Sequence, residues 1–247
     1  MTAGQRKSLI QIVGEVGSEA LRCLKLDRER AQGLLKNGGE FKTIIRKPFI
    51  EAVRRYALNN PWHFITDWPA EWQRFYRKLF NRKVNFSRLV MPAPRPGFNW
   101  PVMMAQGLTL NEVWAKCKDC FPCQSYIGED ENMDAIVTAN DRTPDKAYVV
   151  CFRGRVEADE ENNNLSANDL ELRKISGIVL RERCVMELWY NDVTSGGHLD
   201  TKNITLCSGS RLSDGNVPNA NWLGGEFRVD YGRPDDADDL SCSRSAA

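Results

Sequence analysis

The chain has 247 residues, of which 42% are hydrophobic and 27% are charged. This length and composition suffice for one large packed domain or for a core with an appended segment, and they exclude a repeat or low-complexity protein. No apolar stretch approaches the roughly 20 residues of a membrane-spanning helix. We also recognise no export signal, so we expect no membrane span, a cytoplasmic location and reduced thiols.

The net charge of +1 conceals two halves of opposite sign. Residues 1–100 hold 19 Lys and Arg against 8 Asp and Glu, whereas residues 101–247 hold 15 against 25. A basic segment of this kind attracts nucleic acid or an acidic protein surface. The alternative, which we favour, is that it neutralises the acidic part of its own chain.

Residues 1–90 are predicted to form a helical, basic, aromatic-rich N-terminal region. Within it, aromatic and aliphatic residues recur at the spacing of one helix face: Trp72, Phe75, Tyr76 and Leu79. Basic residues are interleaved with them: Arg74, Arg77, Lys78, Arg82 and Lys83. Such a stripe is most often a core face, although rings beside cations also suit weak stacking contacts with nucleic-acid bases.

Residues 91–101 hold four prolines and are interpreted as a linker, after which we expect a single domain over residues 102–247. A capping box between Thr109 and Glu112 predicts the first helix of that domain. Apolar residues in 178–190 predict a second helix. The short apolar runs that follow or separate these helices predict strands at 147–152 and 204–207.

Residues 207–247 combine a strand-like pattern with a polar, turn-rich composition. Residues 226–231 alternate as a half-buried strand does, with Phe227, Val229 and Tyr231 expected to face the core. The segment contains no Lys, Gln, Met, His or Ile. Framework residues are spaced through it: Gly209, Arg211, Gly215, Val217, Pro218, Trp222, Val229 and Pro234. These features predict a folded scaffold that displays an irregular polar surface.

Segments upstream of this tail carry a resemblance to a known family: 107–117 (GLTLNEVWAKC), 121–123 (FPC), 138–161 (TANDRTPDKAYVVCFRGRVEADEE), 165–170 (LSANDL) and 198–211 (HLDTKNITLCSGSR). Together with the tail they resemble the target (variable) proteins of diversity-generating retroelements, of the kind seen in candidate-phyla bacteria with small genomes. The resemblance covers roughly residues 60–247. It implies an α+β fold, namely a C-type-lectin-like domain with a helical N-terminal extension. In that family template adenines are copied unfaithfully, so Asn codons become codons for many residues but never for Lys, Gln or Met.

The resemblance further implies that exposed side chains of the tail form a ligand-binding face. The candidate residues are Leu212, Asp214, Asn216, Asn219, Asn221, Leu223, Arg228, Asp230, Gly232, Arg233, Asp235, Asp236, Asp238, Ser241 and Ser243. Glu226 is on the same predicted side, but its codon type excludes it from Asn-codon mutagenesis. Because the residues at these candidate positions are mainly acidic, we expect a macromolecular ligand with a basic patch, most readily a protein.

Two patterns suggest metal sites, and we favour a simpler interpretation of each. Cys117, Cys120 and Cys123 partly match an iron–sulfur spacing, but buried free thiols are favoured. The acidic run at 235–239 offers the oxygen ligands that calcium needs, but a solvated loop is favoured. We therefore expect no metal and no cofactor.

We expect the protein not to be an enzyme, and we assign no catalytic residue. His63 and His198 are the only histidines, and no phosphate-binding loop, dinucleotide fingerprint or nucleophile elbow is present in the sequence. The main alternative is an oxidase similar to formylglycine-generating enzyme, which shares the lectin-like fold and binds copper through cysteines. Only Cys207 and Cys242 are available for that role near the C-terminus.

Overall fold

A computed structural model describes residues 60–127 and 132–247, together with Gln32 and Gly39. The chain divides into two compact units, Met1–Arg55 and Tyr56–Ala247, and the second contains nearly all described residues. The predictions for residues 1–58 therefore lie outside the described residues, apart from Gln32 and Gly39. Within the described ranges, no helix has both the length and the apolar composition needed to cross a membrane.

The aromatic stripe at residues 72–79 lies on helix α4 (Trp68–Phe80), as its spacing predicts. The side chain of Asp67 caps this helix by accepting a hydrogen bond from the N–H of Ala70 at 2.9 Å. Trp72 and Tyr76 are fully buried and donate hydrogen bonds to the main chain of strand β1 (Trp100–Met104), at 2.8 and 2.9 Å. Helix α4 is thus part of the main core.

This packing corrects the expected domain boundary. The aromatic residues before the prolines share one core with the later helices, so the compact unit starts near Tyr56 and not near Val102. Strand β1 also begins inside the predicted linker of 91–101, at Trp100. The prolines correctly indicated irregular chain over most of this segment. They could not show that Trp62, which precedes the segment, stacks on Trp100 near its end, with ring centroids 5.1 Å apart.

Strand β1 pairs antiparallel with β4 (Tyr148–Phe152), which confirms the strand predicted at 147–152. The predicted capping box is present at the start of helix α5 (Leu110–Cys120), where Thr109 and Glu112 each bond the other's main chain. The second predicted helix is α8 (Leu180–Thr194). Both helices therefore form where local sequence signals place them.

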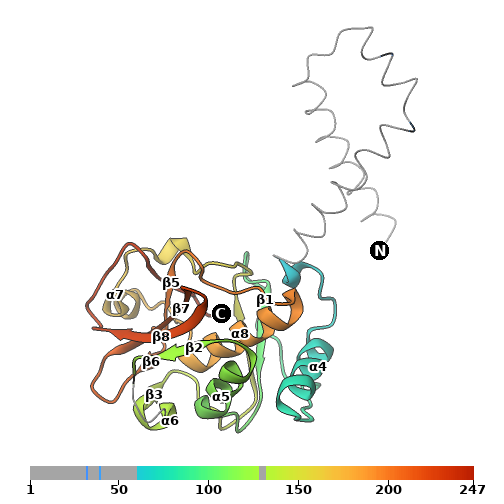
Figure 1. Ribbon diagram of the computed structural model, residues 1–247, viewed down its shortest axis with the longest axis horizontal. Helices are drawn as coiled ribbons and strands as arrows, with labels where there is room; N and C mark the ends of the chain where they lie inside the picture. Colours follow the sequence, from blue (N-terminus) through green and yellow to red (C-terminus); the bar gives the residue numbers. More distant parts are fainter. Residues whose placement is uncertain (1–31, 33–38, 40–59, 128–131) are drawn as a thin grey trace. The chain divides into compact units, whose positions relative to one another are not determined.

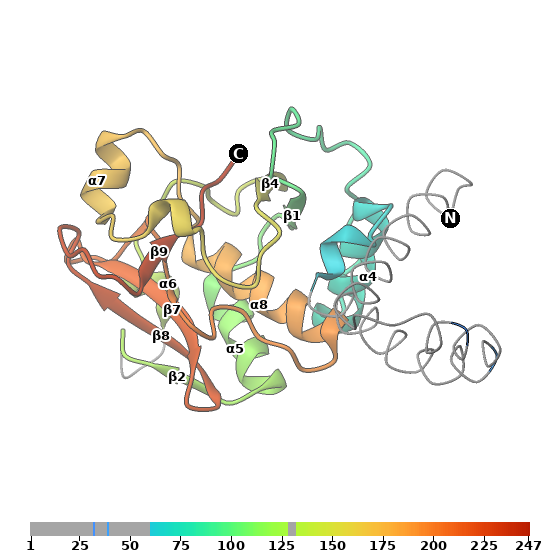
Figure 2. The same ribbon diagram turned by 90° about the horizontal axis from the view of Figure 1, so that it is seen from above.

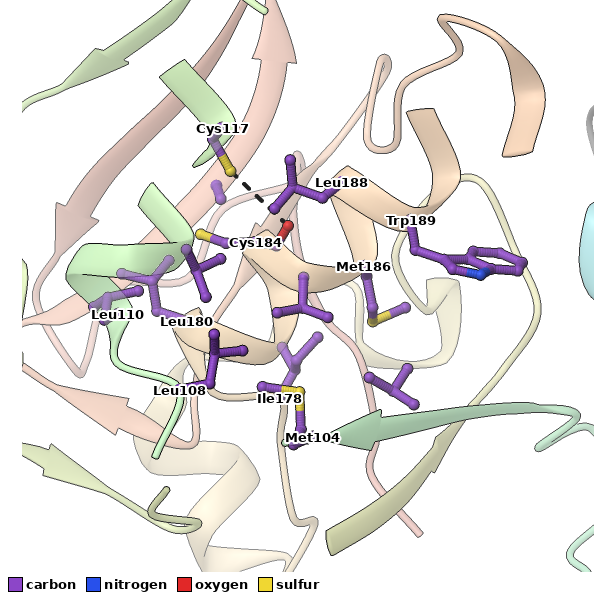
Figure 3. Close-up of a cluster of buried hydrophobic side chains, with 14 of the residues drawn as sticks. Met104, Leu108, Leu110, Cys117, Ile178, Leu180, Cys184, Met186, Leu188 and Trp189 are labelled. Atoms are coloured by element: carbon purple, nitrogen blue, oxygen red, sulfur yellow. Dashed lines mark hydrogen bonds between the residues drawn. The ribbon is translucent and has the colours of Figure 1, made fainter. Parts of the chain in front are cut away.

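Helix α8 forms the centre of the unit, and every residue from Leu180 to Tyr190 is buried. It is covered by α5, by the β1–β4 pair and by a five-stranded sheet, so no side of it faces water over this stretch (Figure 2). Figure 3 shows the aliphatic and sulfur-containing side chains around it, where the thiol of Cys117 on α5 lies 4.0 Å from the carbonyl oxygen of Cys184.

The five-stranded sheet has the order β2-β8-β7-β5-β9. Its pairs are antiparallel between β5 and β7 and between β7 and β8, and parallel at the two edges. The bounds are β2 (Cys123–Ser125), β5 (Ile204–Leu206), β7 (Val217–Leu223), β8 (Glu226–Gly232) and β9 (Ser241–Ser243). The strands predicted at 204–207 and 226–231 are confirmed.

Short elements complete the unit. A third small sheet pairs β3 (Ala139–Asn140) with β6 (Ser210–Arg211). The remaining helices are η1 (Pro61–His63), α6 (Met133–Ile136), η2 (Glu160–Asn162) and α7 (Ala167–Leu172). The fold is therefore α+β, with α5 and α8 between the five-stranded sheet on one side and α4 with the β1–β4 pair on the other (Figures 1 and 2).

Candidate ligand-binding face

The hairpin of β7 and β8 forms the centre of the tail. Gly224 and Gly225 connect the two strands with φ angles of +67° and +87°. Two consecutive positive φ angles are typical of the type I′ turn, whose twist matches that of paired strands. A side chain at either position would strain this turn, so the two glycines fix the register in which Ala220 faces Val229 and Asn221 faces Arg228.

Alternation along this hairpin separates two sets of side chains. Ala220, Phe227 and Val229 point inward and are fully buried against α5 and α8. The side chains between them point away from the helices, and we call them the outer face: Asn219, Asn221, Leu223, Glu226, Arg228 and Asp230. All six are partly or fully exposed. The hairpin therefore has a core side and a solvent side, as the alternating sequence predicts.

Helix α7 limits the outer face at one end. Leu206 of β5 is directly opposite Asn219 and so points to the same side, but it is buried with Leu170 of α7 and Val217. Figure 2 shows α7 beside the β9 end of the sheet. On the side of the sheet that carries the outer face, Leu206 of β5 and Val217 at the start of β7 are therefore buried, while the outward residues from Asn219 onward are partly or fully exposed. Figure 1 shows β7, β8 and β2 side by side in this sheet.

The charges of the outer face are partly paired. The guanidinium of Arg228 contacts the carboxylate of Glu226 at 2.8 Å, and both side chains are about one-third exposed (32% and 29%). Asp230 is exposed, and one of its oxygens accepts a hydrogen bond from the N–H of Tyr231 at 2.8 Å. An exposed ion pair of this kind contributes no more than about 1 kcal/mol to stability. The pair is therefore available to exchange partners.

Residues 233–240, which we call the acidic loop, connect β8 to β9. Since β7 and β5 lie between these two strands, the loop has to pass the sheet on one side, and the N–H of Asn168 on α7 donates to the carbonyl of Pro234 at 2.9 Å. Asp236 and Asp238 accept hydrogen bonds from main-chain N–H groups of the loop itself, at 3.0 and 2.8 Å. The carboxylates thus shape the loop while remaining exposed.

Behind the hairpin, Trp222 is held by a stack of rings. The rings of Trp222 and His198 are nearly parallel, 8° apart, with centroids separated by 3.3 Å, and Phe121 meets both edge-on. The Nδ1 atom of His198 lies 2.8 Å from Glu187 on α8. Trp222 is only partly buried, so it lies at the margin of the core.

A buried charge network fastens the last strand to the core. Arg183 on α8 and Arg244 near the chain end bind different oxygens of Asp200, at 2.7 and 2.6 Å, and all three side chains are essentially inaccessible to water. Arg183 also binds Glu187 at 2.7 Å. These carboxylates raise the pKa of Arg183 against the opposing effect of burial. The network keeps the tail in place from the inside, independently of the outer face.

The structure brings one third of the predicted site residues together on the outer face. Asn219, Asn221, Leu223, Arg228 and Asp230 share the outer face. A second group, comprising Arg233, Asp235, Asp236 and Asp238, lies on the acidic loop and is exposed, while Gly232 and Ser241 flank that loop and are partly exposed. Asp214 and Asn216 lie apart, in the turn before β7, where the two side chains bond each other at 2.8 Å.

Three predictions of exposure or burial in the tail are wrong. Leu212 is only 6% exposed and packs in the main core. Ser243 in β9 is fully buried, where its carbonyl oxygen accepts a hydrogen bond from the side chain of Asn162 and its hydroxyl lies 2.8 Å from that of Ser208. Neither can contact a ligand. Tyr231 was expected to face the core, yet it is 45% exposed, although Pro218 directly opposite it in β7 is buried. Alternation predicts to which face of the sheet each side chain points, but not how far the packing on that face extends.

Sequence reasoning missed two residues of the open surface. Gln124 of β2 is directly beside Arg228 of β8 in a parallel pair, and it is exposed. Tyr126, one residue beyond β2, is half exposed, and its N–H donates to the carbonyl of Val229 at 2.9 Å. The alternation of residues 123–127 was a usable signal, but a three-residue strand is too short to be recognised from it.

The aromatic stripe of α4 does not offer a stacking platform. Trp72, Phe75 and Tyr76 are fully buried. Three of the five interleaved cations pair with acidic groups of the same unit: Arg74 and Lys78 bind Asp192, and Arg82 binds Glu112. Within the described residues, this supports the interpretation that basic side chains of the first half neutralise acidic ones of the second, and it contradicts base stacking on these rings.

The three cysteines of the iron–sulfur-like spacing differ in how deeply they are buried. Cys117 is buried, Cys120 is exposed at the end of α5, and Cys123 lies partly buried in β2, where burial raises the pKa of its thiol to about 12. Every described cysteine is a free thiol. Among the described residues, no group of three or more His, Cys, Asp or Glu side chains is placed to hold a metal ion, the acidic loop included.

The two cysteines of the oxidase alternative also have separate surroundings. The Cys207 thiol lies 3.8 Å from the carbonyl oxygen of Thr205, and that of Cys242 lies 3.5 Å from the amide oxygen of Asn163. Both are buried, and burial raises the pKa of each thiol. Elsewhere, a hollow of about 560 Å³ lies between α7, β3 and β6, and no outward residue of β7 or β8 lines it.

Comparison with known proteins gives no relative. No protein-family model and no curated protein matches the sequence, and no solved structure matches the fold.

Proposed function

We propose that this protein is a ligand-binding display protein whose C-terminal face is diversified by a retroelement, on a domain of the C-type-lectin-like type. The observation that carries the proposal is the division of labour within one hairpin. Ala220, Phe227 and Val229 hold the strands to the helices, while Asn219, Asn221 and Asp230 alternate with them and are partly or fully exposed.

Such a hairpin suits diversification for a physical reason. Substitution of an exposed strand residue shifts stability by about 0.5 kcal/mol or less, whereas substitution in the core changes packing. The turn glycines and the buried Arg183–Asp200–Arg244 network fix the backbone without any help from the outer face. The outer side chains can therefore change while the fold is retained.

The shape of the surface favours a macromolecular ligand. The outer face lies on a sheet, its six side chains are partly or fully exposed, and it adjoins the exposed acidic loop. Small-molecule sites are usually concave and apolar, whereas protein contacts of standard size bury roughly 800 Å² on each partner. An open surface that mixes Asn, Leu, Tyr and Arg is also similar in composition to antibody binding sites.

The charge of this surface favours a protein over a nucleic acid. The outer face and acidic loop carry six carboxylates, of Glu226, Asp230, Asp235, Asp236, Asp238 and Asp239, against the guanidiniums of Arg228 and Arg233. Phosphate groups would be repelled by this excess of negative charge. A protein with a basic patch would be attracted, and salt would weaken its association.

The gene locus provides the direct test of diversification. We expect a near-copy of codons 207–247 beside the gene, together with a reverse-transcriptase gene, and mismatches between the two copies at adenines of the template. A complete locus that contains neither would refute diversification. Mismatches spread equally over all bases would do the same.

A protein-level test concerns the outer face. A variant in which Asn219, Asn221, Leu223, Arg228 and Asp230 are all replaced by Ser should remain folded, with an unchanged midpoint in urea, but should lose its binding partner. The matched control replaces Glu171 and Leu172 on α7, which are exposed outside the outer face, and should keep the partner. Retention of the partner by the Ser variant would place recognition elsewhere.

A further inference from the structure

We propose that the recognition surface extends beyond the tail onto β2, where Gln124 and Tyr126 form a fixed strip that binds a basic, extended segment of a protein ligand. We call these two residues the β2 strip. The inference rests on the proposed function, because it names the ligand chemistry of the same surface. It adds residues that lie outside 207–247 and so remain the same in every diversified copy.

The position of the strip follows from the sheet register. Strand β2 runs parallel to β8, with Gln124 opposite Arg228 and Ser125 opposite Val229. The hydrogen bond of 2.9 Å from the N–H of Tyr126 to the carbonyl of Val229 continues this pairing by one residue. Since alternate side chains of a strand share a side, Gln124 and Tyr126 point to the side of Arg228 and Asp230.

Tyr126 combines an exposed ring with a backbone that is hydrogen-bonded to the sheet. Half of its surface is open to water, and it is one of few large hydrophobic side chains in the described residues with this exposure. Leu223 on the same side is 51% exposed. An aromatic ring and an aliphatic side chain held on a rigid sheet lose little conformational entropy on binding, which makes them good contact residues.

The chemistry around Tyr126 selects a cation. The face of a Tyr ring attracts Arg or Lys, an interaction of about 0.5–2 kcal/mol. In the neighbouring strand, the exposed carboxylate of Asp230 lies at the next position along the same side. A guanidinium or ammonium group placed between them would meet both an aromatic face and a negative charge. The acidic loop adds attraction over a longer range.

The backbone of β2 suits an extended ligand. β2 is the last strand on its side of the sheet, and among the described residues no strand pairs with its other edge. Main-chain N–H and C=O groups on such an edge can pair with an added strand. A basic peptide segment lying along β2 would bring alternate side chains over Tyr126 and Gln124. A nucleic acid offers neither this pairing nor the matching charge.

The test uses a phage-displayed library of random twelve-residue peptides selected on the immobilised full chain. We expect selected peptides to be enriched in Arg and Lys that alternate with apolar residues. Binding of one such synthetic peptide, measured by fluorescence anisotropy, should weaken about 3- to 10-fold in Tyr126→Ala, which corresponds to the loss of one cation–π contact. Asp230→Asn should weaken it similarly and reduce its salt dependence.

Matched controls separate this effect from a change of fold. Phe64→Ala removes an aromatic residue of comparable exposure, 55%, outside the sheet, and Asp119→Asn removes an exposed carboxylate at the end of α5. Neither should change peptide affinity. Near-ultraviolet circular dichroism and urea midpoints of all four variants should match those of the unchanged protein.

The outcomes distinguish this inference from the proposed function. Loss of peptide binding in the five-residue Ser variant but not in Tyr126→Ala would overturn the role of the β2 strip and keep the display face. Loss in Tyr126→Ala but not in the Ser variant would support the strip and contradict recognition by the tail. No enrichment of basic peptides, or enrichment of acidic ones, would overturn the stated ligand class.

Discussion

Alternate residues of the same two strands form the two sides of the β7–β8 hairpin, yet the two sides have different roles. The inner side holds Ala220, Phe227 and Val229 at zero exposure against α5 and α8. The outer side holds amides, a carboxylate and a weakly constrained ion pair, all of them partly or fully exposed. The comparison teaches that successive residues of one strand can serve stability and recognition in turn, because their side chains point to opposite faces of the sheet.

The comparison extends to the charges. Behind the sheet, Asp200 is fully buried between Arg183 and Arg244, so each charge depends on its partners. On the outer face, Glu226 and Arg228 pair while both contact water. A buried pair that loses one member leaves an uncompensated charge in the core, whereas an exposed pair is simply hydrated. The largest predicted effect therefore concerns the buried network.

Replacing Asp200 with Ala should destabilise the protein by about 3–5 kcal/mol, because two buried guanidiniums lose their shared carboxylate. Urea unfolding followed by circular dichroism measures this change. The matched substitution Asp230→Ala on the outer face should change the free energy of unfolding by less than about 0.5 kcal/mol. Equal effects of the two would mean that the hairpin has no separate display side.

Replacing Phe227 with Ala should cost about 3–5 kcal/mol through lost burial and a cavity beside Trp114 and Phe121. Its outward neighbour in the same strand provides the control. Arg228→Ala removes as many heavy atoms but only a partly exposed ion pair, so it should cost no more than about 1 kcal/mol. Thermal and urea melts of the two variants would compare the stability contributed by an inward and an outward residue of the same strand.

Replacing Gly225 with Ala should cost about 1–2 kcal/mol, because its φ of +87° is strained for any residue with a Cβ atom, although nothing crowds the position. Gly232, at the other end of β8, has no positive φ, and an added Cβ would lie 3.7 Å from Asp236. Gly232→Ala should therefore be neutral or stabilise the protein by less than about 1 kcal/mol. The opposite order of stability would argue against the type I′ turn.

The smallest expected effect belongs to the acidic loop. Asp236→Ser should shift the free energy of unfolding by about 0.5 kcal/mol or less, since the Ser hydroxyl can still accept the hydrogen bond from the N–H of Arg233. Its effect on binding should be larger than its effect on stability. A destabilisation similar to that of Phe227→Ala would show that the loop belongs to the core.

Features with local causes could be predicted from the sequence. The capping box at Thr109 and Glu112 satisfies the first amides of α5 whatever surrounds it, and the apolar spacing of 72–79 defines one face of α4. The alternation of 226–231 likewise gave the parity of β8. Each signal lies within one element, so it is present in the sequence before any tertiary contact forms.

Features that depend on neighbours could not be predicted. The burial of Leu212 and Ser243, and the exposure of Tyr231, follow from where helices and loops cover the sheet. The membership of α4 in the main core depends on the hydrogen bonds that Trp72 and Tyr76 donate to the main chain of strand β1, more than 20 residues further along the chain. The β2 strip depends on a three-residue strand that is recognisable only beside β8.

By itself, the sequence determined the α+β class, the two main helices and the inward and outward residues of the principal hairpin strand, because periodicity and capping act over a few residues. Only the tertiary structure decided which outward residues reach water, that Asp200 joins Arg183 to Arg244, and that Gln124 and Tyr126 lie beside the tail. Exposure and partnership are set by segments far apart in the chain, and their packing is not encoded in any local pattern.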